Sequence, residues 1–376
     1  MKRYSIPNHT DCYVEYTGDI MAMFSPQPMK VVYDSDTFIA VNISREDGQG
    51  ASIQLSREPI LAGGKYVCTF DLSRPMQLLC DIEEAMDNIA YRQSGFQRHS
   101  TSITISVLDD AQDELFYATI DVLYAACDAG EAISATTERR RLFINFPQTI
   151  SLGVDTTGVA TITHGEEQRS YAAEGKMQVQ VDLLAFMAEA VFDTSALLQC
   201  REDSIEVSWS NSIVDNESSS TASATKRYIL VPDLSPAGRG VYLRWMQRDG
   251  SIGYWLFGKS KKTFAASNGN AFVRHLAGNP AAPVNRVYRN GARQDYGISE
   301  TITIGTSNVS DEEYEYLCGL VSSPVVDMLV DGSTPTWMRV NVVAGSYERE
   351  YPKSGLERIA DFELAITLPA KNTIKY

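Results

Sequence analysis

The stretch Thr101-Ser102-Ile103-Thr104-Ile105-Ser106-Val107 decides the fold class, because apolar and polar side chains alternate along it. In an extended strand this alternation gives one apolar and one polar face, as in an antiparallel sheet with one buried face. Ser204–Trp209 repeats the pattern. Other strands are predicted at Lys30–Tyr33, Phe38–Ile43, Lys65–Leu72, Leu115–Leu123, Arg141–Phe146, Lys226–Val231, Met338–Val343 and Asp361–Thr367. The sequence therefore predicts a mainly β protein of two or three antiparallel β-sandwich or barrel-like modules with a few short helices.

The clearest single element is a hairpin of Val241–Met246 and Ile252–Phe257. Asp249-Gly250 lies between the two strands and supplies residue types that tolerate positive φ. The hairpin carries two Trp and two Tyr, and aromatic residues on strands favour the core or cross-strand pairs. An exposed ligand platform is the alternative.

Three short helices are expected. An apolar stripe at helical spacing within Leu183–Val191 follows Asp182, which is a suitable N-cap. Ser310 and Glu313 have capping-box spacing and predict a helix that ends before Pro324. A further stripe, flanked by strand-like residues, lies within Leu78–Ile89.

Two polar stretches, Asp128–Glu138 and Asn216–Thr225, indicate connections between domains. With boundaries near residues 135 and 233, the chain divides into an N-terminal β domain (1–135), a middle β domain with a short helix (136–233) and a C-terminal β domain with one capped helix (234–376). Ala265–Gln294 has weak periodicity and is expected to form an arm or a long loop.

The charge of the chain disfavours nucleic acid as a partner. Lys and Arg total 33 against 48 Asp and Glu, which gives a net charge of −15, and negative charge repels phosphate. Two short basic runs, Arg139-Arg140-Arg141 and Lys259-Ser260-Lys261-Lys262, lie beside predicted strands and are interpreted as solvated flanks.

No membrane partner, secretion signal or disulfide framework is expected. Met1–Pro7 is basic but leads into no apolar core of a signal peptide, and no apolar run is long enough to span a bilayer. The six cysteines are scattered singly and are expected to be reduced thiols, mostly in the core.

The sequence lacks recognisable catalytic or metal-binding motifs and therefore predicts no enzyme, no metal and no cofactor. The four histidines include no pair at the spacing that places two imidazoles on one ion. Asp34-Ser35-Asp36 and Asp109-Asp110 are interpreted as turns because the rest of a calcium loop is missing. Hydrolase-elbow, P-loop and dinucleotide motifs are absent, and Gly63-Gly64-Lys65 is only a fragment of a phosphate loop. A glycoside hydrolase stays open as an alternative, since two carboxylates can converge through folding.

The last third of the chain carries a family resemblance. Its segments are VYLRWMQRDGSIGYWLFGKS (241–260), SDEEYEYLCGLVSSPVVDML (310–329) and WMRVNVVAGSYEREYPKSGLERIADFELAI (337–366). Over about residues 240–370 their order resembles tail- and baseplate-associated structural proteins of tailed bacteriophages, especially phages and prophages of Bacteroidetes. The resemblance implies a virion protein without catalytic residues, assembled in the host cytoplasm. Whether it implies a tail adaptor, baseplate, neck or receptor-facing subunit stays open.

A virion subunit of this kind would contact other virion structural proteins, as one copy in a homo-oligomeric ring that covers its sheet edges. Asn216–Thr225 and the arm within Ala265–Gln294 are the expected contact segments, and the alternative is that both are mobile surface loops. The arm carries apolar side chains that a contact could bury. These are Phe272, Val273, Leu276, Val284, Val287 and Tyr288. The competing hypothesis is a carbohydrate- or receptor-binding β module that exposes Trp245, Tyr254, Trp255 or Trp337 to sugars.

Overall fold

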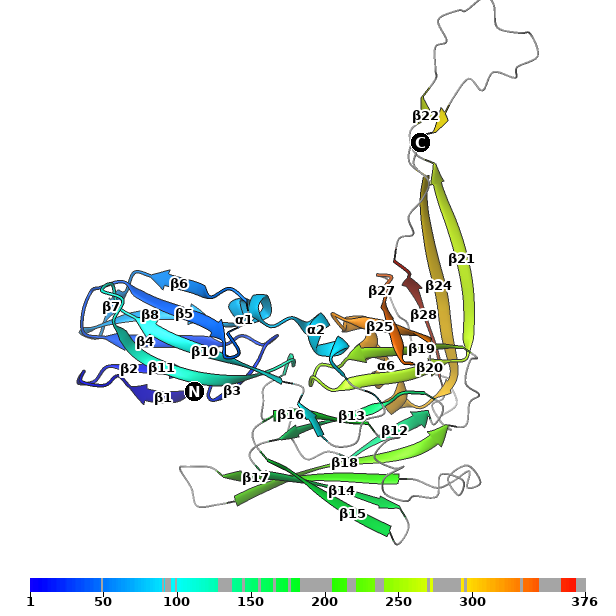
Figure 1. Ribbon diagram of the computed structural model, residues 1–376, viewed down its shortest axis with the longest axis horizontal. Coiled ribbons are helices and arrows are strands. Elements are labelled where there is room, and N and C mark those ends of the chain that lie inside the picture. The colour runs from blue at the N-terminus through cyan, green and yellow to red at the C-terminus, as the bar shows by residue number, and fades with distance from the viewer. Residues whose placement is uncertain are drawn as a thin grey trace, which may run out of the picture. The chain divides into compact units, whose positions relative to one another are not determined.

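A computed structural model of the chain describes residues 1–48, 50–89, 91, 96–98, 100–127, 137–143, 146–154, 157–164, 167–174, 177–182, 205–214, 221–233, 240–268, 271–272, 292–293, 296–331, 334–344 and 360–369. These residues form several mostly antiparallel sheets and three short helices (Figure 1). The prediction of a mainly β protein is confirmed. Each sheet in the described part of the chain is open, so no barrel forms there.

The chain forms two compact units. Unit 1 contains Met1–Ala237, Trp245–Tyr254 and Ser323–Val325, and unit 2 contains Gly238–Arg244, Trp255–Ser322 and Val326–Tyr376. The division into three domains at residues 135 and 233 stays a prediction.

Unit 1 begins with two five-stranded sheets that form a sandwich-like pair. The first has the order β1-β2-β4-β8-β7 and the second β3-β11-β10-β5-β6. Tyr4 and Tyr16 of the first sheet contact Phe116 of the second, with ring centroids 5.7 and 6.0 Å apart. The strands are β1 (Lys2–Ser5), β2 (Tyr13–Tyr16), β3 (Ile20–Ala22), β4 (Pro28–Tyr33), β5 (Ile39–Arg45), β6 (Ile53–Arg57), β7 (Ile60–Ala62), β8 (Lys65–Asp71), β10 (Ser100–Leu108) and β11 (Glu114–Leu123).

The alternation of Thr101–Val107 appears in β10 as expected. Ile103, Ile105 and Val107 are buried, and the strand pairs antiparallel with β5 and β11. Gly63 and Gly64 form the tight turn between β7 and β8, both at positive φ. That turn geometry explains the glycine pair without a phosphate.

The stripe within Leu78–Ile89 forms two helices instead of one, α1 (Ser73–Leu79) and α2 (Ile82–Asp87). Cys80 and Asp81 are extended, and the Asp81 side chain accepts a hydrogen bond from the Glu83 N–H at 2.8 Å. An aspartate that caps a new helix stops the preceding one from continuing. The stripe within Leu183–Val191 lies outside the described residues.

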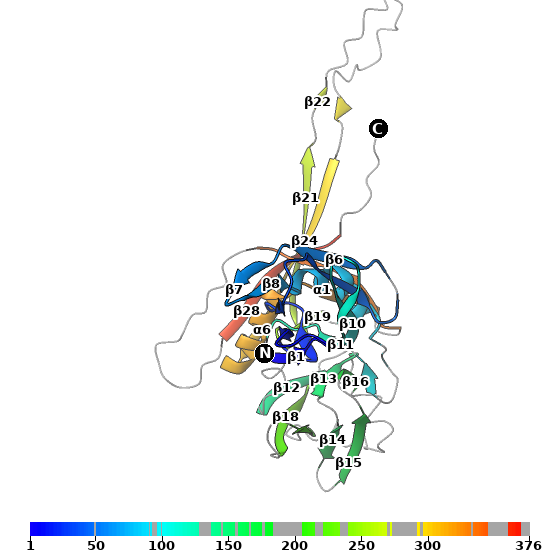
Figure 2. The same ribbon diagram turned by 90° about the vertical axis from the view of Figure 1, so that its left-hand side faces the viewer.

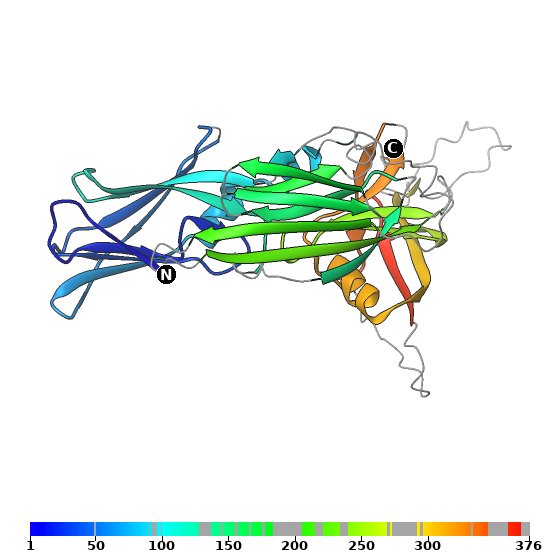
Figure 3. The ribbon, with the colours of Figure 1, turned by 90° about the horizontal axis from the view of Figure 1, so that it is seen from below.

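The rest of unit 1 contains a mixed sheet of order β12-β18-β17-β14-β15 and a small sheet β13-β16-β9. The antiparallel strands β14, β17 and β18 run side by side (green in Figure 3), whereas β12 is parallel to β18. Because β18 begins at Thr221, the second half of the expected connection Asn216–Thr225 is strand. The bounds are β9 (Phe96–Arg98), β12 (Thr137–Phe143), β13 (Thr149–Val154), β14 (Thr157–His164), β15 (Glu167–Glu174), β16 (Met177–Asp182), β17 (Ile205–Val214) and β18 (Thr221–Asp233).

The hairpin predicted at Val241–Phe257 is confirmed as β19 (Val241–Met246) and β20 (Ile252–Phe257). It belongs to a four-stranded sheet of order β20-β19-β25-β26, in which β25 is Val326–Asp331 and β26 is Thr336–Arg339. Gly250 has a φ of 79° in its turn. The predicted strand Met338–Val343 is split, because Val340 separates β26 from β27 (Asn341–Val342) and these two strands join different sheets.

The second sheet of unit 2 has the order β21-β24-β28-β27. β21 (Lys259–Asn268) and β24 (Tyr296–Val309) form a long antiparallel ribbon (Figure 2), and β28 (Ala360–Thr367) pairs with β24 from Thr301 onward. The expected arm Ala265–Gln294 therefore begins inside a strand. Its short strands β22 (Ala271–Phe272) and β23 (Ala292–Arg293) also pair.

Helix α6 (Asp311–Ser322) begins with the predicted capping box. The Glu313 N–H donates to Ser310 Oγ at 3.3 Å, and the Ser310 N–H donates to Glu313 Oε2 at 3.0 Å. Tyr314 packs on Phe362 of β28, with ring centroids 5.4 Å apart. The cap thus fixes the start of a helix whose buried side covers the sheet.

We expect Ser310→Ala to lower the free energy of unfolding by about 1 kcal/mol, because it removes the acceptor of the Glu313 N–H. Urea unfolding followed by tryptophan fluorescence measures the change. Ser322→Ala, at the exposed opposite end of α6, is the control and should have a smaller effect. Equal effects of the two substitutions would contradict the capping role.

Candidate functional site

The aromatic rings of the β19–β20 hairpin lie in the core. Trp245, Tyr254 and Trp255 are buried, as the core interpretation expects. Packing against Trp245 is tight, since a Cβ on Gly253 would lie 2.4 Å from its ring atom Cε2. These three rings therefore offer no open face to a sugar. The alternative of an exposed ligand platform was wrong for these three residues. Trp337 of β26 is half-buried.

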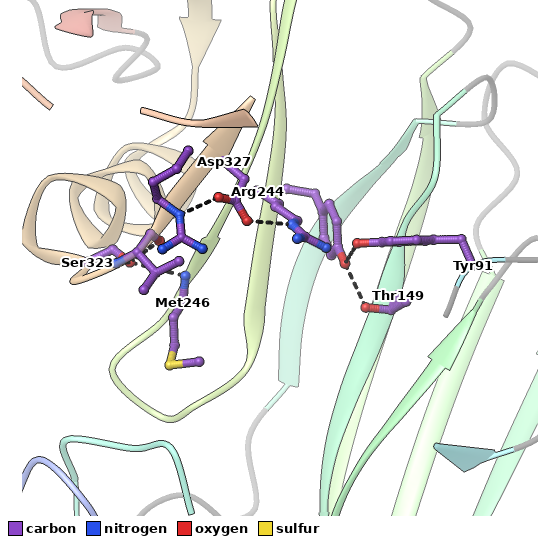
Figure 4. A network of polar contacts seen from close by, with 9 residues as sticks. Tyr91, Thr149, Arg244, Met246, Ser323 and Asp327 are labelled. Carbon is purple, nitrogen blue, oxygen red and sulfur yellow. Dashed lines mark hydrogen bonds and ion pairs between the residues drawn. The ribbon is translucent and has the colours of Figure 1, made fainter. Parts of the chain in front are cut away.

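A buried carboxylate joins two arginines in unit 2 (Figure 4). Asp327 Oδ2 accepts a hydrogen bond from Arg244 Nε at 2.9 Å, and Oδ1 accepts one from Arg339 Nε at 2.6 Å. Arg244 and Asp327 have side chains only 1% and 2% exposed. The Arg244 guanidinium also lies 4.4 Å from the centre of the Trp337 ring. The sheet pairing explains the arrangement, because Asp327 and Arg339 are direct cross-strand partners.

The buried carboxylate and its two arginines form a structural ion-pair cluster. Removing charges from water is costly, and hydrogen bonds to both carboxylate oxygens offset the cost. The interaction ties β19, β25 and β26 together. Sequence reasoning missed it, although the charged Arg244 inside the apolar run Val241–Met246 was a usable signal, since a charge in a buried strand needs a partner.

Three hydroxyl groups form a second polar network, in unit 1 (Figure 4). The Tyr254 hydroxyl lies 2.8 Å from Thr149 Oγ1 and 3.1 Å from the Tyr91 hydroxyl. Tyr254 and Thr149 are buried. The network supplies hydrogen-bond partners for groups that have left water. In the same unit, the Met246 N–H donates a separate hydrogen bond to Ser323 Oγ at 3.1 Å.

His9, Cys12 and Asp34 bring three potential metal ligands together in unit 1, with donor atoms within 4.8 Å of one another. Cys12 is buried, His9 is half-buried and Asp34 is exposed. Burial raises the pKa of the Cys12 thiol and the Asp34 carboxylate adds to the rise, while Lys65 acts in the opposite direction. The sequence search missed this cluster because it compared histidines only with one another.

The remaining cysteines follow the prediction where the structure describes them. Cys12, Cys68, Cys80 and Cys127 are buried free thiols, and Cys318 is a half-buried one. Burial raises the pKa of Cys80 to about 12, so this thiol stays protonated near neutral pH and is a poor nucleophile. Cys200 lies outside the described residues.

The basic runs have acidic partners. Arg140 pairs with Glu138, and Arg141 Nη1 lies 3.9 Å from Asp233 Oδ2. Lys262 Nζ lies 2.7 Å from Glu300 Oε2, whose side chain is almost buried. Both runs lie inside strands, β12 and β21, and not beside them, so the expectation of strand flanks was wrong. Their acidic partners agree with charges on the surface of a sheet.

Two of the sheet edges in the described part of the chain expose apolar side chains. β7 ends the first sheet of unit 1, and its Ile60 and Leu61 are 73% and 63% exposed. β21 ends a sheet of unit 2, and every residue from Lys259 to Ala266 is exposed, including Phe264. Of the expected interface residues, Phe272 lies in β22, where only the backbone is described. Val273, Leu276, Val284, Val287 and Tyr288 lie outside the described residues.

Comparisons with known proteins add no family. No family model matches the chain, and no curated protein matches it. A solved structure of a 1.5-MDa bacterial ice-binding adhesin, concerned with its retention at the host cell surface, matches 80% of this chain and 94% of its own. Its sequence identity is 10% and its TM-score 0.16, so the match shows neither a shared fold nor a shared function. Within the part of the chain that the structure describes, no helix is long and apolar enough to cross a membrane.

We expect Asp327→Ala to lower the free energy of unfolding by about 3–5 kcal/mol, because the buried Arg244 guanidinium would lose the carboxylate that balances its charge. Urea unfolding followed by tryptophan fluorescence measures this. Asp361→Ala is the matched control, since Asp361 forms an exposed pair with Lys259 and should contribute less than about 1 kcal/mol. If Asp327→Ala costs no more than the control, the central role of the buried pair is wrong.

Proposed function

We propose that this chain is a non-enzymatic structural subunit of a phage tail, baseplate or neck assembly, and that its partners are other virion proteins and further copies of itself. The resemblance over about residues 240–370 supports the assembly class. The observation that carries the proposal is an apolar sheet edge in the N-terminal sandwich.

The apolar edge is β7, Ile60-Leu61-Ala62. All three residues are exposed, although strand side chains normally alternate between an exposed and a buried face. Proteins protect open sheet edges with charged residues or proline. The opposite edge of the same sheet, β1, carries Lys2 and Arg3, whereas β7 carries no charge. An uncharged apolar edge is suited to a contact that covers it.

A three-residue strand offers few backbone hydrogen bonds, so the side chains of Ile60 and Leu61 would supply most of the free energy of such a contact. Each fully buried aliphatic side chain contributes roughly 1.5–3 kcal/mol. In a ring, this edge would meet a different surface of the next copy.

The β21–β24 ribbon supports the same proposal from unit 2. Its outer strand is exposed on both faces from Lys259 to Ala266, and it leads toward the arm expected from the sequence. Lys259 and Lys262 along this edge protect it against unspecific pairing. A partner would therefore have to match its charges.

We expect the purified chain to form particles of several copies, and Leu61→Lys to shift them toward a monomer, because a charge on β7 opposes burial. Light scattering coupled to size-exclusion chromatography measures the mass. Leu78→Lys is the matched control: Leu78 is 74% exposed but lies on α1. The control should leave the mass unchanged.

A wild-type chain that stays monomeric and is absent from virions by electron microscopy with specific labelling would overturn the proposed function. Equal effects of Leu61→Lys and Leu78→Lys would show that β7 is not the contact edge.

A further inference from the structure

Several side chains that can bind a metal ion lie at one end of the first sheet of unit 1. β2 and β4 are antiparallel, with Tyr13 opposite Val32, so the start of β2 and the end of β4 lie together. His9 and Cys12 precede β2, and Asp34 follows β4. The β4–β8 pairing, with Tyr33 opposite Tyr66, adds Lys65 at the same end. Residues far apart in the chain thus meet through strand register.

The distances among the three ligand residues fit a small metal ion. His9 Nδ1 lies 3.6 Å from Asp34 Oδ2, and all three donor atoms lie within 4.8 Å of one another. Ligands of a tetrahedral zinc ion are separated by roughly 3.3–3.6 Å, given zinc–ligand bonds of about 2.0–2.3 Å. Asp34 is exposed, so its side chain is free of the close packing that would prevent a movement of about 1 Å.

We propose that His9, Cys12 and Asp34 bind a Zn²⁺ ion, with water as the fourth ligand. Imidazole, thiolate and carboxylate are the donor types that zinc accepts, and three protein ligands leave one open position. The thiolate and the carboxylate together balance the two charges of the ion. The exposed Asp34 gives the ion a path from solvent to the buried sulfur of Cys12.

Neighbouring groups orient the ligands. The Tyr33 hydroxyl lies 3.4 Å from His9 Nε2, which leaves Nδ1 to face Asp34. The Tyr33 ring also packs on the imidazole, with centroids 4.9 Å apart. A partner on the second nitrogen is the usual way in which proteins fix a metal-binding histidine. Lys65 Nζ lies 3.8 Å from Cys12 Sγ and donates to Thr10 O at 3.0 Å, where it can stabilise a thiolate.

The connection that carries His9 and Cys12 is closed by its own backbone. The Ile6 N–H donates to Cys12 O at 3.0 Å, and Asn8 and Asp11 have φ values of 64° and 58°. A bound ion would tie this connection to the end of β4, so it would stabilise the sandwich. The proposal replaces the expectation that no metal binds.

Cobalt(II) is the probe, because a cobalt–thiolate bond gives a charge-transfer absorption band that carboxylate or imidazole ligands do not give. We expect the full-length reduced chain to show this band with Co²⁺ and to lose it on addition of Zn²⁺. Cys12→Ser should abolish the band. Cys318→Ser, which removes a half-buried thiol on α6, is the control and should retain it.

Asp34→Asn tests the site without disturbing the core, because Asp34 is exposed. We expect it to raise the dissociation constant for Zn²⁺ about tenfold or more, measured by competition with Co²⁺. Absence of the thiolate band in the wild type, or a band that Cys12→Ser leaves unchanged, would overturn the proposal. Zn²⁺ binding that Asp34→Asn leaves unchanged would overturn the role of the carboxylate. None of these results depends on whether the chain forms a ring.

Discussion

An open sheet leaves two edges whose backbone N–H and C=O groups lack strand partners, and this constraint shapes the described part of the protein. Some edge strands carry charged side chains that oppose pairing with another chain, as at Lys2 and Arg3 of β1 and along β21. β7 differs because all of its residues are both apolar and exposed. The proposed role in an assembly rests on this difference. Another chain that covered β7 would remove its apolar side chains from water and pair its free backbone groups.

Inside the sheets, the corresponding constraint is that every buried polar group needs a partner. Asp327 satisfies it for Arg244, which sits in a strand with almost wholly buried side chains. The buried hydroxyl of Tyr254 has a hydrogen-bond partner in the hydroxyl of Thr149. Both networks consist of residues well separated in the chain, so each fixes how strands are placed as well as how they pair. In a low-dielectric interior such hydrogen bonds are strong, and leaving one partner unpaired is costly.

Local patterns predicted much of the fold. Alternation located strands such as β10, β17 and β28 but missed others, the long β24 among them. The Ser310–Glu313 spacing located the start of α6, because both signals depend on residues a few positions apart. The predictions were wrong where a distant partner strand or a local capping residue determines where an element ends. Val340 divides one predicted strand between two sheets, and Asp81 divides one predicted helix into two. The burial of Trp245 and Trp255 was favoured by their strand context but needed the packed structure to be decided.

The sequence by itself determined the β class, the hairpin at Val241–Phe257 and the capped helix, because alternation, turn residues and capping spacing are local properties. Only the tertiary structure decided which charges and ligands meet. Asp327 reaches Arg244 across 83 positions, and His9 and Cys12 reach Asp34 through the register of β2 and β4. Strand register sets these encounters, and register depends on the packing of a whole sheet, which no short window of sequence contains.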